Sequence, residues 1–285
     1  MSYIGRFAPT PTGPLHCGSL VAALASYLDA KANNGKWLLR IEDLDPPRED
    51  PHASTLIPKQ LLAHDLQWDG EIQYQSANTD AYEAALSLLD SKQLLFPCNC
   101  SRKDLAISHG LHQGRCNSTT DKPHALRFLV EHASIAFRDR VYGDYEQDLT
   151  TVGDQILKRK DQLYAYQLAV LVDDFHSAIT HVVRGVDLLD NTPRQIHLLK
   201  QLNWPIPNYL HIPLITNESG QKLSKQNQAP ALELSTPEQN LISALKFLNQ
   251  TAPPLDHSSN KAILDWAIQH WQPGLITPDL AGVLT

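Results

Sequence analysis

The first forty residues constrain the fold of this chain more than any other segment. Residues 3 to 8 form a short apolar run, a proline-rich loop follows, and leucines then recur at every fourth position from Leu20 to Leu28, as on one face of a helix. Gly35 predicts the end of that helix, and residues 37 to 41 have the composition of a buried strand. Two strands joined by a helix form a βαβ unit, and such units build parallel sheets with ligands at the carboxyl ends of the strands. We therefore predict an α/β fold with a doubly wound parallel sheet of the Rossmann type.

Composition and charge exclude several classes of protein. The chain has 285 residues, of which 42% are hydrophobic and 19% charged, an ordinary globular balance. Its formal net charge of −7 excludes a generally basic protein that coats nucleic acid, but not RNA binding on a local basic surface. Apolar runs stay far below the roughly 18 residues of a membrane span, so no membrane contact is expected. Residues 1 to 7 carry no export signal, and we expect a cytoplasmic protein.

The loop before the predicted helix has the residues of a phosphate site. His16, Gly18 and Ser19 lie where the helix begins, and helix N-termini present unpaired N–H groups and partial positive charge to phosphate oxygens. Gly18 permits a ligand to approach the backbone closely, and His16 can donate a hydrogen bond to a phosphate. The alternative is a surface loop with a solvated histidine and a capping serine, and this short motif alone does not exclude it.

A pair of lysines far along the chain supports the phosphate interpretation. Lys222 and Lys225 follow a predicted turn at residues 217–220. A loop that carries two lysines can close over a triphosphate and neutralise the charge that develops during phosphoryl or nucleotidyl transfer. A solvated basic loop is the plainer alternative. The two motifs in this order favour a nucleotide-binding enzyme.

These motifs resemble the two signatures of class I aminoacyl-tRNA synthetases. The first signature is matched by residues 6–13 with His16 and Gly18, and the second by residues 222–225. Further segments between them resemble the glutamyl branch of this class: residues 40–45, 166–169, 172–174, 183–187 and 191–195. The resemblance covers residues 3 to 232 and implies a catalytic core that activates glutamate with ATP.

The segment after the lysine loop narrows the resemblance. A full glutamyl-tRNA synthetase continues into a large helical anticodon-binding region, whereas residues 226 to 285 leave room for only a few helices. A core of this kind without that region is similar to the glutamyl-queuosine tRNA(Asp) synthetase family, which attaches glutamate to the queuosine base in the anticodon loop of tRNA(Asp). The nearest alternative is a truncated glutamyl-tRNA synthetase that charges a tRNA 3′ end. A small nucleotidyltransferase and a non-enzymatic RNA-binding paralogue are more distant alternatives.

Glutamate has two carboxylates and one ammonium, so a selective site needs an anion and at least two cationic or strong donor groups. Glu42, at the end of one predicted strand, can bind the α-ammonium, and Arg6, at the end of the other, can bind a carboxylate through two hydrogen bonds. A structural ion pair between Glu42 and Arg6 is the alternative. The resemblance adds Tyr166 and Arg184 to the pocket, and which arginine binds which carboxylate stays open. The remaining residues of the predicted glutamate site are Phe7, Ala8, Pro9 and Thr10.

One segment has the spacing of a metal site. Cys98 and Cys100 are followed a dozen positions later by His112 and Cys116, and four N and S ligands at such spacing fit tetrahedral zinc. A disulfide between cysteines two residues apart would be strained. The segment has few large apolar residues, so a bound metal would supply folding free energy that it otherwise lacks. We predict one structural Zn²⁺ per chain, with His109 as a rival of His112 and a set of free thiols as the alternative.

The predicted reaction has two steps and uses groups from distant parts of the chain. The α-carboxylate of glutamate attacks the α-phosphorus of ATP, which carries Mg²⁺, and a queuosine hydroxyl then attacks the glutamyl-adenylate. His16, Lys222 and Lys225 are the predicted catalytic residues, and Gly18 and Ser19 join His16 and Lys225 at ATP. The predicted units, in a monomer, are two catalytic halves (1–96 and 151–234), a zinc-containing insertion (97–150) and a helical C-terminal region (235–285).

Overall fold

A computed structural model describes residues 2–116, 118, 120–131, 133–215, 232–254 and 259–278 of the chain. Three parallel strands, β1 (Ile4–Phe7), β2 (Lys36–Ile41) and β3 (Gln73–Tyr74), pair in that order. A second sheet has the order β7-β6-β10-β9, in which β9 (His181–Gly185) and β10 (Asn208–Ile212) are parallel. Its other strands, β6 (Ser134–Asp139) and β7 (Gly143–Asp148), form an antiparallel hairpin.

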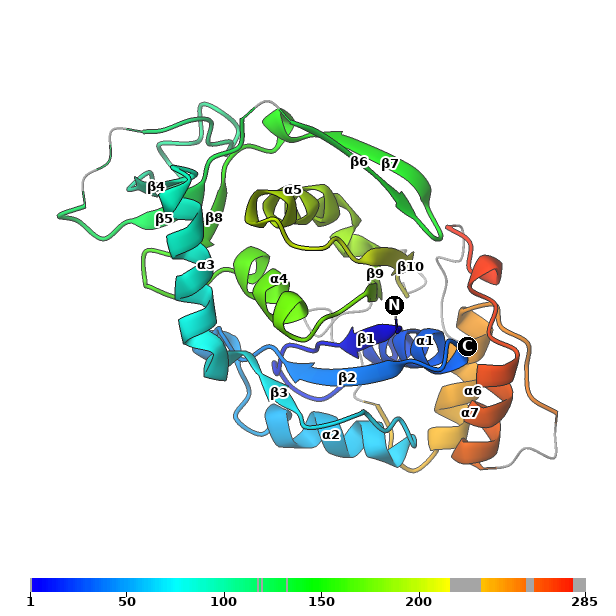
Figure 1. The fold of residues 1–285 in the computed structure, drawn as a ribbon. Coiled ribbons are helices and arrows are strands. Elements are labelled where there is room, and N and C mark those ends of the chain that lie inside the picture. The colour runs from blue at the N-terminus through cyan, green and yellow to red at the C-terminus, as the bar shows by residue number, and fades with distance from the viewer. Residues whose placement is uncertain are drawn as a thin grey trace.

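The two sets of parallel strands meet at β1 and β9 (Figure 1). The backbone N–H of Thr180, just before β9, donates to the carbonyl of Ile4 in β1 at 2.9 Å. From β1 the chain continues through α1 to β2 on one side of this junction. From β9 it continues through α5 to β10 on the other side. In open α/β sheets such a reversal lies beside the ligand site, at the carboxyl ends of the strands. The predicted α/β class with a parallel sheet is confirmed.

Helix α1 (Cys17–Ala32) joins β1 to β2 and confirms the predicted βαβ unit. It begins two residues before Ser19 because His16 is its N-cap, and the ring Nδ1 of His16 accepts a hydrogen bond from the Ser19 N–H at 3.3 Å. After the helix, Gly35 packs directly on Tyr3, the residue before β1. A Cβ at Gly35 would lie 2.6 Å from the carbonyl oxygen of Tyr3, so only glycine fits there.

The other helices cover the strands and one another. They are α2 (Ala53–Ala63), α3 (Thr79–Ser91), α4 (Tyr166–His176), α5 (Thr192–Leu202), α6 (Pro237–Phe247) and α7 (Asn260–Gln269). Short 3-10 helices lie at Pro46–Arg48, Gln75–Asn78, Leu149–Thr151, Val186–Asn191 and Pro273–Leu275. Pro58 lies inside α2 without ending it. The apolar run 165–172 has a composition that suits either a buried strand or a helix core, and from Tyr166 onward it belongs to α4.

The helices near the C-terminus share the core of the first βαβ unit. Leu241 of α6 and Ile263 of α7 are fully buried in the same cluster as Leu24 of α1 and Trp37 of β2. Beyond α7, the indole N–H of Trp271 donates to the carboxylate of Asp29 in α1 at 2.9 Å. Helices α6 and α7 are therefore packed against α1.

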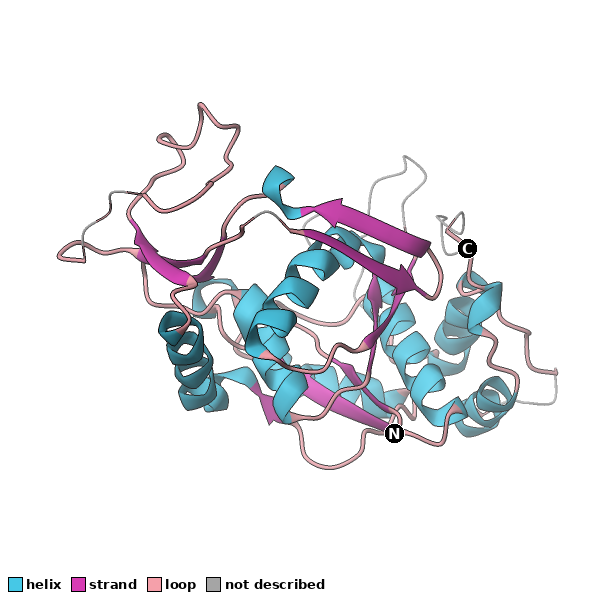
Figure 2. Cartoon of the chain, turned by 45° about the horizontal axis from the view of Figure 1, so that its top comes forward, coloured by secondary structure: helices cyan, strands magenta, loops and turns pink. Residues whose placement is uncertain are grey.

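A third, antiparallel sheet carries the predicted insertion. It consists of β4 (Leu95–Cys98), β5 (Ala125–Phe128) and β8 (Gln155–Lys158). The loop between β4 and β5 extends away from the body of the molecule (Figure 2). Within the described part of the chain, no helix is both long and apolar enough to cross a membrane.

Candidate active site and metal centre

A cavity of about 880 Å³ lies at the carboxyl ends of β1, β2 and β9. β1 contributes Arg6, Glu42 follows β2 directly, Tyr166 is the first residue of α4, and Arg184 belongs to β9. Of the predicted glutamate site, seven residues line this cavity: Arg6, Phe7, Ala8, Thr10, Glu42, Tyr166 and Arg184. Pro9 lines the neighbouring cavity instead. The strand arrangement thus brings together side chains that lie far apart in the sequence.

Two buried arginines beside this cavity share one carboxylate. Oδ1 of Asp174, in α4, lies 3.1 Å from Nε of Arg6 and 2.7 Å from NH1 of Arg40. Burial alone would raise the pKa of Asp174, but the two guanidinium groups bring it below its ordinary value. Arg6 is therefore paired with Asp174, whereas the alternative of a structural ion pair would have paired it with Glu42.

Glu42 is held at the cavity wall as a carboxyl with an unusual pKa. Its backbone N–H donates to the carbonyl of Pro9 at 3.0 Å, which ties the end of β2 to the loop after β1. Burial raises the pKa of Glu42 to about 7, against the lowering effect of Arg40 and Arg6. A cation that enters the cavity would favour the ionised form, so the position suits an ammonium group.

Arg184 reaches the cavity from β9 through a dense set of contacts. Its NH2 donates to Oγ1 of Thr192 at 2.8 Å and to Oε1 of Gln195 at 2.7 Å. Its NH1 donates to the hydroxyl of Tyr166 at 3.4 Å. The residue is only 7% exposed. Arg184 and Tyr166, which only the resemblance placed in the pocket, therefore lie in contact at its wall.

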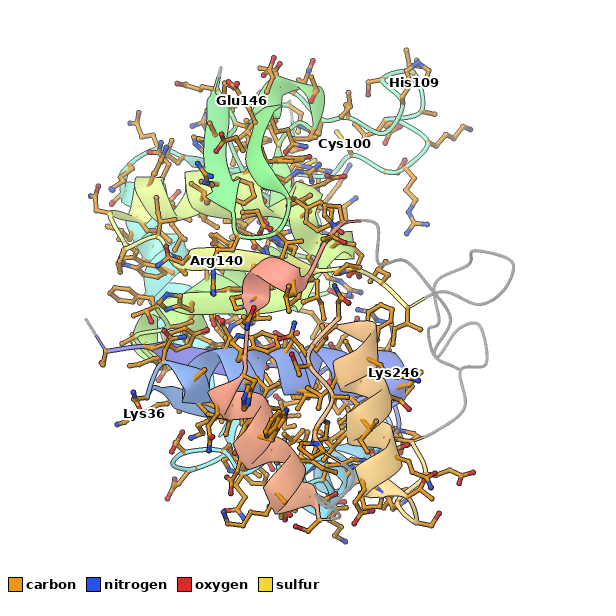
Figure 3. The ribbon with its side chains drawn as sticks, turned by 90° about the vertical axis from the view of Figure 1, so that its right-hand side faces the viewer. Lys36, Cys100, His109, Arg140, Glu146 and Lys246 are labelled. Atoms are coloured by element: carbon orange, nitrogen blue, oxygen red, sulfur yellow. The ribbon has the colours of Figure 1, made fainter. Side chains whose placement is uncertain are left out.

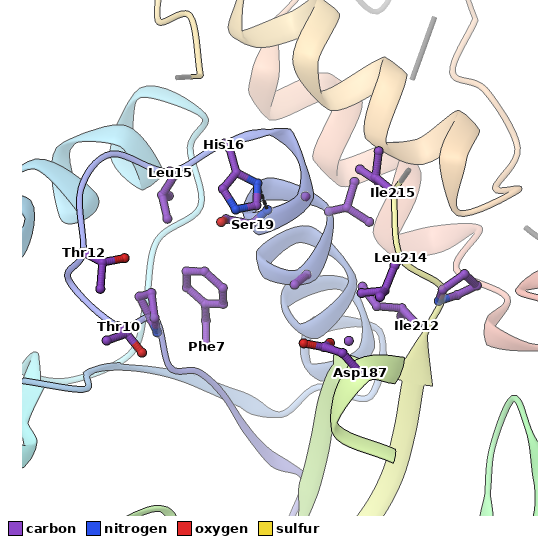
Figure 4. Close-up of a pocket in the computed structure, with 16 residues that line it drawn as sticks. Phe7, Thr10, Thr12, Leu15, His16, Ser19, Asp187, Ile212, Leu214 and Ile215 are labelled. Atoms are coloured by element: carbon purple, nitrogen blue, oxygen red, sulfur yellow. Dashed lines mark hydrogen bonds between the residues drawn. The ribbon is translucent and has the colours of Figure 1, made fainter. Parts of the chain in front are cut away.

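A second cavity, of about 500 Å³, adjoins the first at the N-terminus of α1 (Figure 4). His16, Gly18 and Ser19 line it, together with apolar residues of the segment after β10 such as Leu214 and Ile215. The hydrogen bond between His16 and Ser19 fixes the first turn of the helix. A helix N-terminus beside an apolar wall suits phosphates on one side and a flat aromatic ring on the other.

Lys222 and Lys225 lie outside the described residues, so the structure does not place them. The described chain on either side ends at Ile215 and resumes at Leu232. Both ends lie near α1: Ile215 lines the second cavity, and the N–H of Leu232 donates to the carbonyl of Leu15 at 2.9 Å.

The predicted metal ligands converge in the insertion. One ligand atom from each of Cys98, Cys100, His112 and Cys116 lies within 4.8 Å of the others. In a tetrahedral site each sulfur lies about 2.3 Å from zinc, and the sulfurs therefore lie about 3.8 Å from one another. Small side-chain movements would bring the four ligand atoms to these distances. Burial and the neighbouring thiols of Cys98 and Cys116 raise the pKa of Cys100 to about 11. A divalent cation would favour the ionised form of Cys100, and this donor set fits one.

The rival histidine is not in the cluster. Figure 3 shows His109 at the outer end of the insertion loop, away from Cys100. His112 is instead 5% exposed, and its ring Nδ1 lies 3.1 Å from a carboxylate oxygen of Asp154. A carboxylate on one ring nitrogen fixes the orientation of a metal-ligating histidine and leaves the other nitrogen for the metal. Gly153 makes this approach possible, because a Cβ there would lie 2.5 Å from the carbonyl of His112.

Several residues of the site had no assigned role in the sequence. Asp174 and Asp187 fall within segments that carried the family resemblance, yet nothing in the sequence pointed to Asp174 as the partner of two arginines. Further lining residues of the first cavity are Thr12, Ala22, Arg48, Val183, Gly185, Asp187 and Leu188. Arg48 lies in a 3-10 helix, where no periodicity indicates which side it faces.

Comparisons with known proteins identify the class to which this fold belongs. A family model described as tRNA synthetases class I (E and Q), catalytic domain, matches residues 4–116 and 102–236. A glutamate-tRNA synthetase structure from Elizabethkingia anophelis superimposes with a TM-score of 0.84 at 23% identity, over 99% of this chain and 68% of that one. The fold is that of a class I tRNA synthetase catalytic domain.

Relatives of similar length define the family more narrowly. The glutamyl-Q tRNA(Asp) synthetase of Pseudomonas fluorescens is 48% identical over 284 residues, covering 98% of this chain and 95% of that protein. The protein of the same name from Thiobacillus denitrificans is 49% identical over 279 residues, covering 94% of this chain and 93% of that protein. The chain belongs to the glutamyl-Q tRNA(Asp) synthetase family.

Proposed function

We propose that this enzyme activates L-glutamate with ATP and transfers the glutamyl group to queuosine in the anticodon loop of tRNA(Asp). The observation that supports this most is the junction of two cavities, one lined by Arg6, Glu42 and Arg184 and the other built on the N-terminus of α1. Both cavities include Phe7 and Thr10 in their walls, so the two ligands would lie in contact. The first cavity offers one anionic and two cationic side chains, which match the ammonium and the two carboxylates of glutamate. The helix N-terminus in the second cavity matches the phosphates of ATP.

In this proposal each charged group of glutamate has a partner. Ionised Glu42 binds the α-ammonium, and Arg6 and Arg184 bind the two carboxylates as planar donors. The hydroxyl of Tyr166, which accepts from Arg184, donates to the substrate. Phe7, Ala8, Pro9 and Thr10 form the wall between glutamate and ATP.

Activation is a displacement at the α-phosphorus of ATP. The attacking α-carboxylate is ionised near pH 7, so no general base is needed, and catalysis comes from positioning and charge stabilisation. We assign His16 and the N–H groups at Gly18 and Ser19 to the phosphates. Lys222 and Lys225 neutralise charge as pyrophosphate leaves, and the Mg²⁺ that accompanies ATP contributes further neutralisation. The products of this step are glutamyl-adenylate and pyrophosphate.

In the second step a queuosine hydroxyl attacks the carbonyl carbon of glutamyl-adenylate, forms an ester and releases AMP. We propose zinc for the cluster of Cys98, Cys100, His112 and Cys116, with a structural role in the insertion. The enzyme would act as a monomer in the cytoplasm, with the units 1–96, 97–150, 151–234 and 235–285.

Transfer of labelled glutamate to tRNA(Asp) tests the proposal. Queuosine-containing tRNA should accept glutamate, queuosine-free tRNA should not, and nuclease mapping should place the label in the anticodon loop. Label at the 3′ end of either tRNA would instead identify a glutamyl-tRNA synthetase. Absence of glutamate-dependent ATP–pyrophosphate exchange would reject glutamate activation altogether.

Replacing Glu42 with Gln should lower kcat/KM for glutamate in that exchange about 10²-fold at pH 8, because a charge-assisted hydrogen bond to the ammonium is lost. In the wild type, kcat/KM should rise with pH through about 7, where Glu42 of the free enzyme ionises. The variant should lack this rise. Identical pH profiles for the two proteins would contradict the role of Glu42.

Thermal unfolding of the same pair gives an independent check. Burial raises the folded-state pKa of Glu42 above its ordinary 4.5, so its contribution to stability is complete below about pH 4.5 and is lost as the pH rises through about 7. Gln does not titrate. The Tm of Glu42→Gln should therefore increase relative to that of the wild type between pH 5 and 8.

A further inference from the structure

Arg184 donates to a protein group from each of its three side-chain nitrogens. Its NH2 is satisfied by Thr192 and Gln195, and its NH1 donates to Tyr166. The remaining nitrogen, Nε, donates to Nε2 of His211 at 3.1 Å. Arginine has no acceptor, so the lone pair on Nε2 of His211 receives this bond.

The hydrogen bond to Arg184 determines which ring nitrogen of His211 is protonated. With the lone pair on Nε2, the proton of a neutral ring resides on Nδ1, which donates to Oδ2 of Asp139 at 2.7 Å. The side chains of His211 and Asp139 are fully buried. Burial lowers the pKa of His211, and the nearby guanidinium of Arg184 lowers it further. The ring is thus a neutral bridge between a carboxylate and a guanidinium.

Asp139 is itself held rigidly at the end of β6. Its Oδ1 accepts from the backbone N–H groups of Val141 and Tyr142, both at 2.9 Å, in the turn of the β6–β7 hairpin. Its Oδ2 also accepts from the backbone N–H of His211 in β10 at 3.1 Å. These hydrogen bonds fix the orientation of the Asp139 carboxylate and align it with the imidazole of His211.

We propose that His211 and Asp139 are positioning residues that hold the Arg184 guanidinium in the orientation that binds a carboxylate of glutamate. This inference rests on the proposed glutamate site. Neither His211 nor Asp139 lines the cavity, so both act through Arg184. A guanidinium on a flexible stem binds a carboxylate well only when its plane is fixed, and small misplacements of binding groups reduce rates strongly.

Two substitutions at His211 separate positioning from packing. His211→Phe keeps a ring in the core but leaves Nε of Arg184 without an acceptor. This variant should raise KM for glutamate about 10- to 100-fold in pyrophosphate exchange, which is the effect expected when a binding group is misplaced. KM for ATP should change less than about twofold, because His211 does not touch the second cavity. His211→Gln carries an amide oxygen that can accept from Arg184, and should recover most of the glutamate affinity.

A purely structural role predicts a different pattern. A lowered Tm in His211→Phe with an unchanged KM for glutamate, or equal rises of both KM values, would overturn the inference. Failure of His211→Gln to recover any affinity would also count against it.

Nitrogen-15 NMR of the enzyme without substrates tests the arrangement apart from the proposed function. The wild type should show a slowly exchanging Arg184 Nε–H signal and a His211 ring protonated at Nδ1, and the Arg184 signal should be lost in His211→Phe. A wild-type protein with these signals but no glutamate-dependent exchange would refute the proposed function alone. A His211 ring protonated at Nε2 would refute the positioning role.

Discussion

Replacing Asp174 with Asn is expected to lower the free energy of unfolding by about 3–5 kcal/mol and to abolish measurable glutamate-dependent exchange. Asp174 is the shared partner of Arg6 and Arg40, which are 4% and 1% exposed. Within the described chain, Nε and NH2 of Arg40 have no hydrogen-bond partner, so Asp174 supplies the main compensation for the buried charge of Arg40. Asn would leave two buried guanidinium groups beside a neutral amide.

Urea denaturation measures this effect, and an exposed ion pair supplies the matched control. Asp144 lies 4.0 Å from Arg138, with both side chains more than 80% exposed, and Asp144→Asn should change the unfolding free energy by less than about 0.5 kcal/mol. The double variant Asp174→Asn/Arg40→Met removes one of the uncompensated charges and should recover part of the stability. Equal stabilities of Asp174→Asn and Asp144→Asn would disprove the shared role of Asp174.

Metal removal is expected to open the insertion while the parallel sheets stay folded. A chelator should release one Zn²⁺ per chain. The local stability of residues 97–124 should fall by about 4 kcal/mol or more, the effect expected on loss of a ligand whose Kd lies far below its concentration. Few apolar side chains of this loop are buried: Ile107, for example, is 94% exposed. Hydrogen exchange read by mass spectrometry should show lost protection in this segment and little change in β1, β2 and α1.

The fourth cysteine provides the control for the metal site. Cys17 begins α1 and is not part of the cluster, so Cys17→Ser should retain the full metal content. Cys116→Ser should lose the metal and reproduce the exchange pattern of the chelated protein. Unchanged protection in metal-free protein would show that the insertion folds without the ion.

The parts of this molecule that the sequence predicts best are those whose residues lie close together in the chain. The βαβ unit follows from periodicity within forty residues, and the metal ligands lie within one short segment. The sequence predicts α4 less well, because a short apolar run such as residues 165–172 does not distinguish a buried strand from a helix core. Tertiary packing resolved that ambiguity.

Contacts between distant segments were not predictable from a single sequence. Asp174 is 168 residues from Arg6 and 134 from Arg40, and nothing local distinguishes it from Asp173, which instead accepts from Gln75, Asn78 and Tyr82. The same holds for Asp154 behind His112. Residue type, spacing and the family resemblance predicted side chains that line the cavity, but only the fold identifies the groups behind them.

Charged side chains at the ends of β1, β2 and β9 are expected to converge on one glutamate molecule beside ATP. A crystal structure of the enzyme with glutamate and a non-hydrolysable ATP analogue tests it most directly. We predict the glutamate ammonium at Glu42, its carboxylates at Arg6 and Arg184, and the nucleotide phosphates at the N-terminus of α1. Glutamate bound elsewhere, or these three side chains turned toward separate regions, would contradict the account.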